Sequence, residues 1–261
     1  MIETITIIGG HARTGESEPV EKIDLKMGDV VSIVGPTGSG KTTLINDIEL
    51  FAEANTPTGR IVLINGERPL DEYRNDPSHH PIALITQHTS FLSDLPVAEF
   101  LTTHARIRTG ARAQIEDMLE RTLAFANQLT GEPVPLDARM TELSGGQARA
   151  LLIADATIIC DTPIVLLDEV ENAGINRSRA LELLREHRKI FIFVTHDPHI
   201  ALLSDYRIVM KGGAVTQVLR TNEDERAVCV RVGQLDELLS RLREQIRLGE
   251  RLTAGEAEVA A

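Results

Sequence analysis

The stretch VVSIVGPTGSGKTTLINDIELF, residues 30–51, decides the fold of this chain. It begins with an apolar run, Val30–Val34, which is typical of a strand covered on both faces. Glycines follow at Gly35, Gly38 and Gly40, and glycine lets a backbone turn where other residues would be strained. The remaining residues, TTLINDIELF, have the apolar spacing of a helix. A strand, a glycine-rich turn and a helix in this order predict an α/β fold with the turn at the end of the strand.

The turn reads Gly35-Pro36-Thr37-Gly38-Ser39-Gly40-Lys41-Thr42 and fits the pattern G-x-x-x-x-G-K-[ST]. Its glycines allow successive backbone N–H groups to face one phosphate cluster, and the helix N-terminus adds positive potential. Lys41 would reach the β- and γ-phosphates of a nucleotide, and the Thr42 hydroxyl would bind Mg²⁺, with Thr43 beside it. The alternative, a glycine-rich turn that arose by chance, is disfavoured because strand, lysine and helix are all present.

A second apolar run, residues 163–167, ends in the acid pair Asp168–Glu169. Asp168 suits a second anchor for Mg²⁺, through water, and Glu169 is placed to polarise an attacking water. The alternative is a solvated cap at a strand end. His196 ends another apolar run, IFIFVTH, where a structural histidine is the alternative to one that hydrogen-bonds a γ-phosphate or the attacking water.

Composition limits the function classes. The 261 residues can form one large core, or one core with a small subdomain, and a net charge of −12 argues against an extended nucleic-acid footprint. Aromatic residues make up 3% of the chain, which argues against a base-stacking surface. We therefore expect no nucleic-acid partner.

Several features point to a reducing compartment. Cys160 and Cys229 are far apart and have no His or Cys at metal-ligand spacing, and we expect no disulfide framework. The start of the chain, MIETITIIGG, lacks the basic region of a signal peptide. No apolar run approaches the ~20 residues that cross a bilayer, so another chain would have to hold this one at a membrane.

Short β-rich runs alternate with helical patterns along the chain, which predicts a mainly parallel sheet. The expected strands are Thr4–Ile8, Val30–Val34, Arg60–Ile64, Ile82–Ile85, Ile164–Leu167, Ile190–Val194, Arg207–Met210 and Ala214–Leu219.

Between these strands, the polar helical texture of Val97–Gln128 predicts a helical subdomain, about residues 90–157, inserted in a domain of residues 1–220. Residues 221–261 would form a C-terminal extension. In it we expect an exposed charged loop at Asn222–Arg226, an amphipathic helix at Gln234–Leu248 and a frayed tail.

The segment Leu143-Ser144-Gly145-Gly146-Gln147 lies between the phosphate loop and the acid pair. With Gln87 after an earlier strand and His196 after a later one, this set closely resembles the ATP-binding cassette (ABC) ATPases over roughly residues 1–219. The resemblance implies a P-loop NTPase fold of ABC type: a mainly parallel core sheet, an antiparallel β portion and an inserted helical subdomain. It also implies ATP as substrate, Mg²⁺ as cofactor, and Lys41, Gln87, Glu169 and His196 as catalytic residues.

In the family, the LSGGQ loop closes over the γ-phosphate held by another protomer. The resemblance thus implies a head-to-tail homodimer, or a pair with a related cassette, that traps two ATP molecules between Ser144, Gly145, Gly146 and Gln147 of one chain and the phosphate loop of the other. Gln87 would contact Mg²⁺ and the γ-phosphate. Residues 88–92 would line the groove that receives a partner, where Phe91 and Leu92 are either an exposed docking socket or buried at the subdomain base.

The resemblance has gaps. The family stacks an aromatic ring on adenine just after the first strand, where this chain has no Phe, Tyr or Trp. Either His11 or Arg13 stacks instead, or the contact is missing. Val170 replaces the usual Pro after the acid pair, and Asn172-Ala173-Gly174-Ile175 replaces an Asp-containing loop that couples the two ATP sites. Ala150 replaces an Arg after the signature, with Arg149 adjacent.

Three functions are compatible with the resemblance. The first is the nucleotide-binding subunit of a membrane transporter, cytoplasmic and held at the inner face of the membrane by permease subunits. The second is a soluble ABC ATPase that remodels or reactivates a cytosolic partner enzyme; a switch with feeble turnover is a weaker third, because Glu169 and His196 are intact.

Overall fold

The computed structural model describes residues 1–76, 78–86, 89, 91–109, 112–130, 132–168 and 177–253. Its centre is a six-stranded sheet of order β5-β6-β7-β3-β8-β9. The strands are β3 (Val30–Val34), β5 (Ile82–Ile85), β6 (Ile164–Asp168), β7 (Ile190–Val194), β8 (Tyr206–Lys211) and β9 (Ala214–Arg220). Neighbours from β5 to β8 pair in parallel, and β9 pairs antiparallel with β8.

Alternate residues of the central strands enter two different cores, because successive side chains of a strand point to opposite faces. In β6, Val165 and Leu167 join one core, while Ile164 and Leu166 join the other. Every one of these four side chains is fully buried. The unbroken apolar runs that predicted two-sided strands are therefore explained by packing on both faces.

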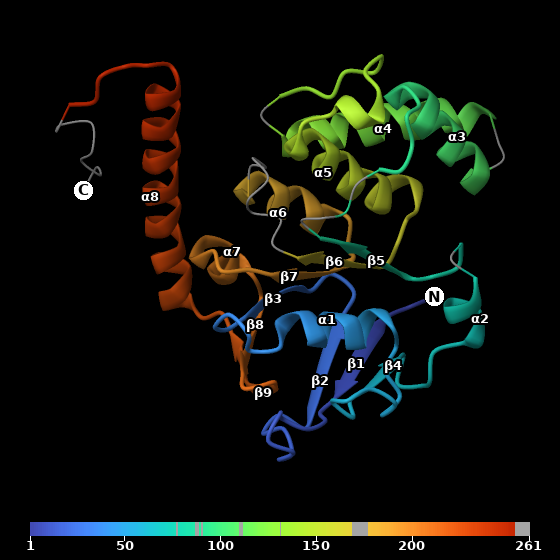
Figure 1. Cartoon of the computed structure of the whole chain (residues 1–261), viewed down its shortest axis with the longest axis vertical. Helices are drawn as coiled ribbons and strands as arrows, with labels where there is room; N and C mark the ends of the chain where they lie inside the picture. The colour runs from blue at the N-terminus through green and yellow to red at the C-terminus, as the bar shows by residue number, and fades with distance from the viewer. Residues whose placement is uncertain are drawn as a thin grey trace.

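The first core lies beneath a layer of helices (Figure 1). This helical layer is formed by the residues that come between β5 and β6 in the sequence. Its helices are α3 (Val97–Thr109), α4 (Arg112–Leu129) and α5 (Gly145–Ala154), with the short turn η1 (Met140–Glu142) and the π-helical turn η2 (Asp155–Ile159). After β6, α6 (Arg177–Glu186) packs against α4 on the same face.

The second core joins α1 (Lys41–Glu49) to a separate three-stranded antiparallel sheet of order β2-β1-β4. Its strands are β1 (Thr4–Ile8), β2 (Lys22–Lys26) and β4 (Ile61–Ile64), followed by the short helix α2 (Asp71–Asn75). Sequence reasoning missed β2, KIDLK, which is an edge strand with two buried residues and three exposed lysine and aspartate side chains. The predicted architecture, an α/β fold with a mainly parallel core sheet, an antiparallel portion and inserted helices, is confirmed.

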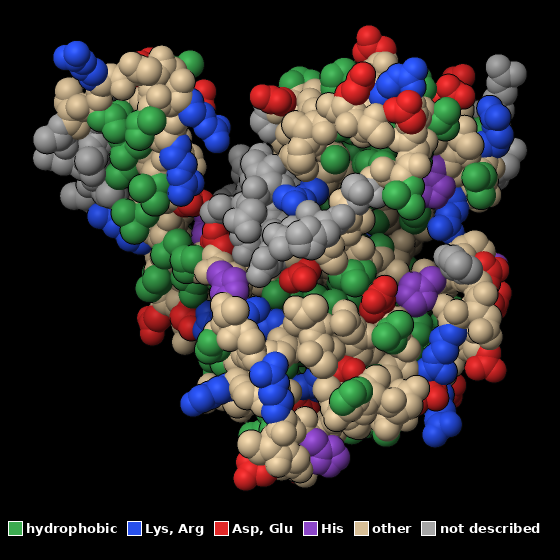
Figure 2. Space-filling view, in the orientation of Figure 1, with side chains coloured by type: hydrophobic (Ala, Val, Ile, Leu, Met, Phe, Trp, Pro, Cys, Tyr) green, Lys and Arg blue, Asp and Glu red, His purple; other side chains and the backbone are tan. Residues whose placement is uncertain are grey.

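The chain ends in α7 (Pro198–Leu203) and the long helix α8 (Glu223–Arg247). Helix α8 packs on α7 near its start and then projects from the body of the molecule (Figure 1). Apolar side chains gather on this helix in Figure 2. The exposed apolar residues of α8 include Leu235, Leu239 and Ile246. Among the helices that the structure describes, none is both long and apolar enough to cross a membrane.

The prediction of an exposed loop at Asn222–Arg226 is wrong. Asn222 is the N-cap of α8: its side chain accepts from the Glu225 N–H at 2.9 Å, and the Glu225 carboxylate accepts from the Asn222 N–H at 3.2 Å. The acidic residues of this segment favour a helix N-terminus, where the helix dipole is positive. The helix predicted at Gln234–Leu248 thus starts eleven residues earlier, at Glu223. The predicted frayed tail lies mostly outside the described residues.

Candidate functional site

The predicted phosphate loop, Asp168 and His196 meet at one edge of the six-stranded sheet. The loop follows β3, Asp168 is the last residue of β6, and His196 comes two residues after β7. The register brings these ends together, because Val194 of β7 pairs with Ile33 of β3 on one side and with Asp168 on the other. The carboxyl ends of parallel strands are where open α/β sheets bind ligands.

Glycine is required at two positions of the loop. Gly40, at the N-cap of α1, has φ of 101°, and a Cβ there would lie 3.0 Å from the Cα of Gly213. At Gly35, φ is 152°, and a Cβ would lie 2.3 Å from the carbonyl oxygen of Met210. The loop is therefore held tightly against the turn between β8 and β9. Pro36, Thr37 and Gly38, by contrast, are exposed at the loop surface.

Two polar groups in the loop suit a phosphate. The Lys41 Nζ donates to the carbonyl oxygens of Gly35 at 2.9 Å and Pro36 at 3.2 Å, so the ammonium lies over the loop. The Ser39 hydroxyl is buried and has no hydrogen-bond partner among the described residues. A buried unpaired hydroxyl is costly, and a phosphate oxygen would satisfy it.

The donors for Mg²⁺ are oxygen atoms, which this ion prefers. Thr42 is exposed in the first turn of α1, Thr43 is exposed beside it, and Asp168 is partly exposed at the same edge of the sheet. This hydroxyl and carboxylate therefore fit the ion, which would also keep water ligands. The third predicted metal contact, Gln87, lies outside the described residues.

Sequence reasoning missed a buried ion-pair network beneath the loop. Arg60, with a fully buried side chain, binds the Glu18 carboxylate through Nη2 at 2.5 Å and the Asp47 carboxylate through Nη1 at 2.9 Å. Its Nη2 also donates to the Gly213 carbonyl at 2.8 Å, and the Gly213 N–H donates to the Ser39 carbonyl at 2.8 Å. The network thus connects β4, α1 and the β8–β9 turn to the phosphate loop.

Electrostatics of this network favour its charged form. Burial raises the pKa of Glu18, but hydrogen bonds from Arg60 and from the backbone N–H groups of Gly10 and Val215 outweigh it, so the net pKa lies below its ordinary value. Burial lowers the pKa of Arg60, and the two carboxylates more than offset this, so its pKa is raised. The sequence gives one signal for this network. Arg60 directly precedes the apolar residues 61–64, and a charged residue is unusual at the start of such a strand.

The two residues predicted to contact adenine lie in different settings. The Arg13 N–H donates to the Gly212 carbonyl at 3.1 Å, which puts Arg13 against the same β8–β9 turn that touches the phosphate loop. The His11 N–H donates to the Thr58 carbonyl at 2.7 Å, and its ring lies beside Gly59. Both side chains are at least partly exposed, and Arg13 is the one linked through a single turn to the loop.

The predicted signature segment begins α5 in the helical layer. The Ser144 Oγ accepts from the Gln147 N–H at 3.3 Å, the Gln147 side chain accepts from the Ser144 N–H at 3.0 Å, and Gln147 Nε2 donates to the Pro133 carbonyl. Ser144, Gly145 and Gly146 are all at least partly exposed. Within the described part of the chain, the hydrogen bonds of Ser144 stay in this layer, and the structure does not bring it to the phosphate loop of its own chain.

The other expected residues have varied outcomes. Phe91 packs on the first core, with its ring 5.1 Å from that of Phe100, while the Leu92 side chain is fully exposed, so each alternative holds for one of the pair. Ala150 is buried in the core, and Arg149 is partly exposed. Glu169, Val170 and the stretch 172–175 lie outside the described residues.

The family follows from comparison with known proteins. The model of a family described as "ABC transporter" matches residues 21–172, which include the phosphate loop, the signature and the acid pair. An uncharacterised ABC transporter ATP-binding protein of Methanocaldococcus jannaschii is 47% identical over 97% of this chain and 95% of its own length. The chain belongs to the ABC transporter family. This ABC protein is accordingly an ATP-binding subunit of the transporter class and an ATPase.

More distant relatives match this chain over only part of their own length. The sulfate/thiosulfate import ATP-binding protein CysA of Gloeobacter violaceus is 31% identical over 76% of this ABC protein, which spans 56% of the CysA chain. Two solved structures share the fold. One is a dimeric ATP-binding cassette with ADP and Pi, with a TM-score of 0.62, 24% identity and coverage of 84% of this chain and 99% of that one. The other is cbiO1 of Clostridium perfringens, with a TM-score of 0.64, 21% identity and coverage of 92% and 100%.

Proposed function

We propose that two copies of this chain close head to tail around two Mg·ATP and that hydrolysis at these two sites drives conformational change in membrane permease partners. One observation is the main support for this proposal. The phosphate loop and the Ser144 segment lie in different layers of one chain, and each has exposed polar groups. A nucleotide on the loop would therefore meet the signature of a second copy. One structural neighbour is itself a dimer in a post-hydrolysis state, which supports this arrangement.

The residues divide the chemistry among them. Backbone N–H groups of the loop, the Ser39 hydroxyl and Lys41 would bind the phosphates, and Gly145–Gly146 of the other copy would offer N–H donors at the start of α5. Mg²⁺, when bound through Thr42 and Asp168, neutralises charge that develops on the phosphates. Glu169 would orient and polarise the attacking water, with His196 as a hydrogen-bond donor near the γ-phosphate.

A complementation experiment tests the composite site. Lys41→Ala disables the loop of one copy, and Ser144→Arg places a bulky cation in the signature of another copy. Each variant alone should lose ATPase activity. Mixed together, they form heterodimers in which one site pairs an intact loop with an intact Ser144, so we expect part of the wild-type rate to return. A mixture as inactive as its components would contradict a site built from two chains.

The dimer itself is tested with Glu169→Gln, which should bind ATP, hydrolyse it very slowly and accumulate as a dimer by light scattering with saturating Mg·ATP. The double variant Glu169→Gln/Ser144→Arg should bind ATP and stay monomeric. A Glu169→Gln protein that remains monomeric, or a double variant that dimerises equally well, would count against the proposal.

Permease partners would place the chain at the inner, cytoplasmic face of a membrane. Support comes from the relatives whose names are import ATP-binding proteins and from Leu92, whose fully exposed side chain lies next to the half-buried Phe91. We expect Leu92 to insert into a permease, because an apolar side chain gains about 1.5–3 kcal/mol on full burial. We also propose that the chain has two parts. Residues 1–220 form the ATPase domain with the inserted helical subdomain, and residues 221–261 form a C-terminal extension.

Copurification from the native host, with wild type and Leu92→Glu compared, tests the partner class. Recovery of membrane permeases that Leu92→Glu loses supports the transporter function. Recovery of a soluble enzyme in place of permeases, retained by both proteins, would instead support the remodelling ATPase. The control variant Leu70→Glu changes another exposed leucine, and it should recover the same proteins as the wild type.

A further inference from the structure

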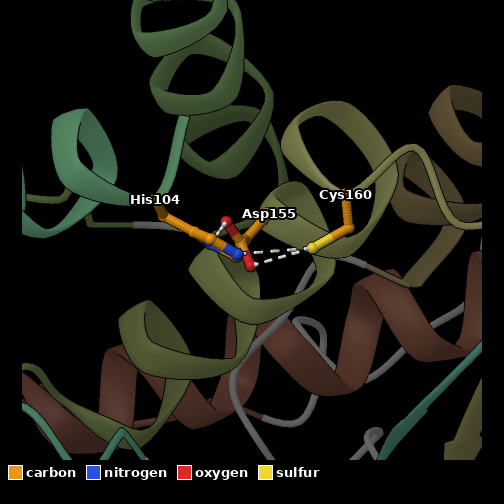
Figure 3. Close-up of side chains that lie close together, drawn as sticks. All are labelled: His104, Asp155 and Cys160. Carbon is orange, nitrogen blue, oxygen red and sulfur yellow. Dashed lines mark hydrogen bonds and ion pairs between the residues drawn. The ribbon is translucent and has the colours of Figure 1, made fainter. Parts of the chain in front are cut away.

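His104, Asp155 and Cys160 form a side-chain cluster in the helical layer (Figure 3). His104 belongs to α3, Asp155 begins η2, and Cys160 directly follows η2. This turn precedes the amino end of β6, whereas Asp168 and the nucleotide site lie at the carboxyl end of that strand. The ATPase chemistry described above therefore makes no use of the cluster.

The three side chains contact one another. The His104 Nδ1–H donates to the Asp155 Oδ1 at 2.8 Å. The Cys160 Sγ lies 3.9 Å from the His104 Nε2 and 3.6 Å from the Asp155 Oδ2. One nitrogen, one oxygen and one sulfur atom thus lie within 4.8 Å of one another.

The π-helical turn brings Asp155 and Cys160 together. In an α-helix, residues five apart are rotated by about 500°, which leaves their side chains about 140° apart around the axis. Here the Cys160 N–H donates to the Asp155 carbonyl five residues earlier at 2.9 Å, so the turn is wider and both side chains face His104. Such single π-turns within helices are uncommon and are frequent at functional sites.

We propose that His104 and Cys160, with Asp155 orienting the histidine, bind a thiophilic divalent metal ion, for which Zn²⁺ is the best match. Thiolate and imidazole together select zinc-like ions over Mg²⁺ and Ca²⁺, which prefer oxygen ligands. Bond lengths of about 2.3 Å to sulfur and about 2.0 Å to nitrogen, at a tetrahedral angle, separate the two ligand atoms by about 3.5 Å. The observed separation between Sγ and Nε2, 3.9 Å, is close to this value, so ligation needs only small side-chain movements.

Asp155 already orients the histidine as metal sites do. Histidine ligands usually donate their second ring N–H to a carboxylate, which fixes the ring and leaves the other nitrogen for the ion. The bond from Nδ1 to Asp155 does this and presents Nε2 to the side of Cys160. The carboxylate lies on the Nδ1 side of the ring, so water would supply the remaining ligands of an ion held by Nε2 and Sγ. Hydrogen bonds to Asp155 and Cys160 raise the pKa of His104 to about 10, so the ring is protonated before the ion binds. On binding, the Cys160 thiol and the His104 Nε2–H each lose a proton to solvent, and the freed lone pairs on sulfur and nitrogen go to the ion.

An ion can reach this cluster from solvent. The side chains of His104 and Asp155 are 25% and 12% exposed, and Cys160 is partly exposed. Bound there, the ion would join α3 to the chain segment between α5, whose N-cap is the signature serine Ser144, and β6, which ends at Asp168. We therefore expect it to stiffen the helical layer.

Titration of the full-length, nucleotide-free protein with Co²⁺ or Zn²⁺ tests the site. Excess Mg²⁺ is kept present, so that Thr42, Asp168 and the surface carboxylates are occupied by their preferred ion. We expect one equivalent of Co²⁺ to give a near-ultraviolet thiolate-to-cobalt absorption band and the intense visible bands of tetrahedral Co²⁺. Zn²⁺ should displace both, and should raise the melting temperature.

The two cysteines supply a matched pair of variants. Cys160→Ser should abolish the sulfur band and the shift in melting temperature, while Cys229→Ser, at the buried cysteine of α8, should keep both. Asp155→Asn should weaken binding by about 10- to 100-fold, as the loss of an orienting carboxylate does. Circular dichroism confirms that each variant is folded.

Wild-type protein is decisive by itself if a variant fails to fold. Absence of a sulfur band with wild type, or a band that Cys160→Ser retains, overturns the proposal. A cluster that serves only as an ion pair between α3 and η2 would show a lower melting temperature in Asp155→Asn but no response to Zn²⁺ in any of the proteins, and this outcome too would overturn the metal site.

Discussion

At the scale of single side chains, Lys41 lies where sequence reasoning placed it, at the start of α1 with its Nζ over the phosphate loop. Lys41→Ala removes a charged donor that a triphosphate would share. Hydrogen bonds to charged groups contribute about 1.5–3 kcal/mol, so we expect roughly a 10- to 100-fold rise in the Kd for ATP by calorimetry. Lys22→Ala, at an exposed lysine of β2, is the control. An unchanged Kd for Lys41→Ala would show that the loop does not hold the nucleotide.

Glu18 gives a prediction about pH at the same scale. Its pKa in the folded protein lies below the ordinary 4.5, because the hydrogen bonds from Arg60 and from two backbone N–H groups outweigh burial. A lowered carboxyl pKa stabilises the fold above the unfolded pKa, and this contribution is lost as pH falls through the folded pKa. Glu18→Gln should therefore lower the free energy of unfolding most near neutral pH, by about 3 kcal/mol, since it breaks a buried pair.

Urea unfolding at a series of pH values checks this prediction. The difference between wild type and Glu18→Gln should shrink as the pH drops below 4.5. Glu21→Gln, at a neighbouring exposed glutamate, should have little effect at any pH. A penalty for Glu18→Gln that stays constant from neutral to acidic pH would mean that the carboxylate is not stabilised in its charged form.

At the scale of elements, α8 depends on its first turn. Asn222 and Glu225 satisfy each other's backbone N–H groups there, and the helix packs on α7 only near this end. Asn222→Ala should destabilise the helix by about 1 kcal/mol, seen as faster amide hydrogen exchange in the first turns. Ser240→Ala, a polar-to-alanine change at an exposed position within the same helix, should leave exchange there equal or slower. Equal exchange in wild type and Asn222→Ala would rule out the cap.

The missed elements have physical explanations at this scale. Strand β2 alternates two buried apolar residues with charged ones, but it is only five residues long and lies between polar segments, so its pattern is weak. The charged start of α8 resembles a loop by composition alone. The spacing of Asn222 and Glu225 is itself a helix N-terminus signal that the composition-based prediction overlooked, and the reciprocal contacts show that it is used.

At the scale of the whole molecule, the resemblance to ABC ATPases predicts that residues 172–175, which lie outside the described residues, couple the two ATP sites, with Ile175 at the place of the family's Asp. Ile175→Asp should therefore change the cooperativity of ATP hydrolysis more than the affinity for ATP. Steady-state rates at a series of ATP concentrations give the Hill coefficient, and calorimetry gives the affinity. Identical Hill coefficients in wild type and variant would show that this position does not couple the sites.

Local motifs determined a large part of this molecule. The glycines, Lys41 and Thr42 act through a continuous strand, turn and helix, so their geometry follows from neighbouring residues. The apolar runs of the central strands likewise predicted a sheet that is covered on both faces, because each residue's burial depends on the period of its own strand.

Only the tertiary structure decided which distant side chains meet. Arg60 pairs with Glu18 at a separation of 42 residues, and His104 pairs with Asp155 at a separation of 51. The periodicity of residues within one strand or helix does not predict such contacts, because they depend on how two sheets and a helical layer stack on one another. For the same reason, the sequence alone named Ser144 as a phosphate contact, and only the fold put it in a different layer from the phosphate loop of its own chain.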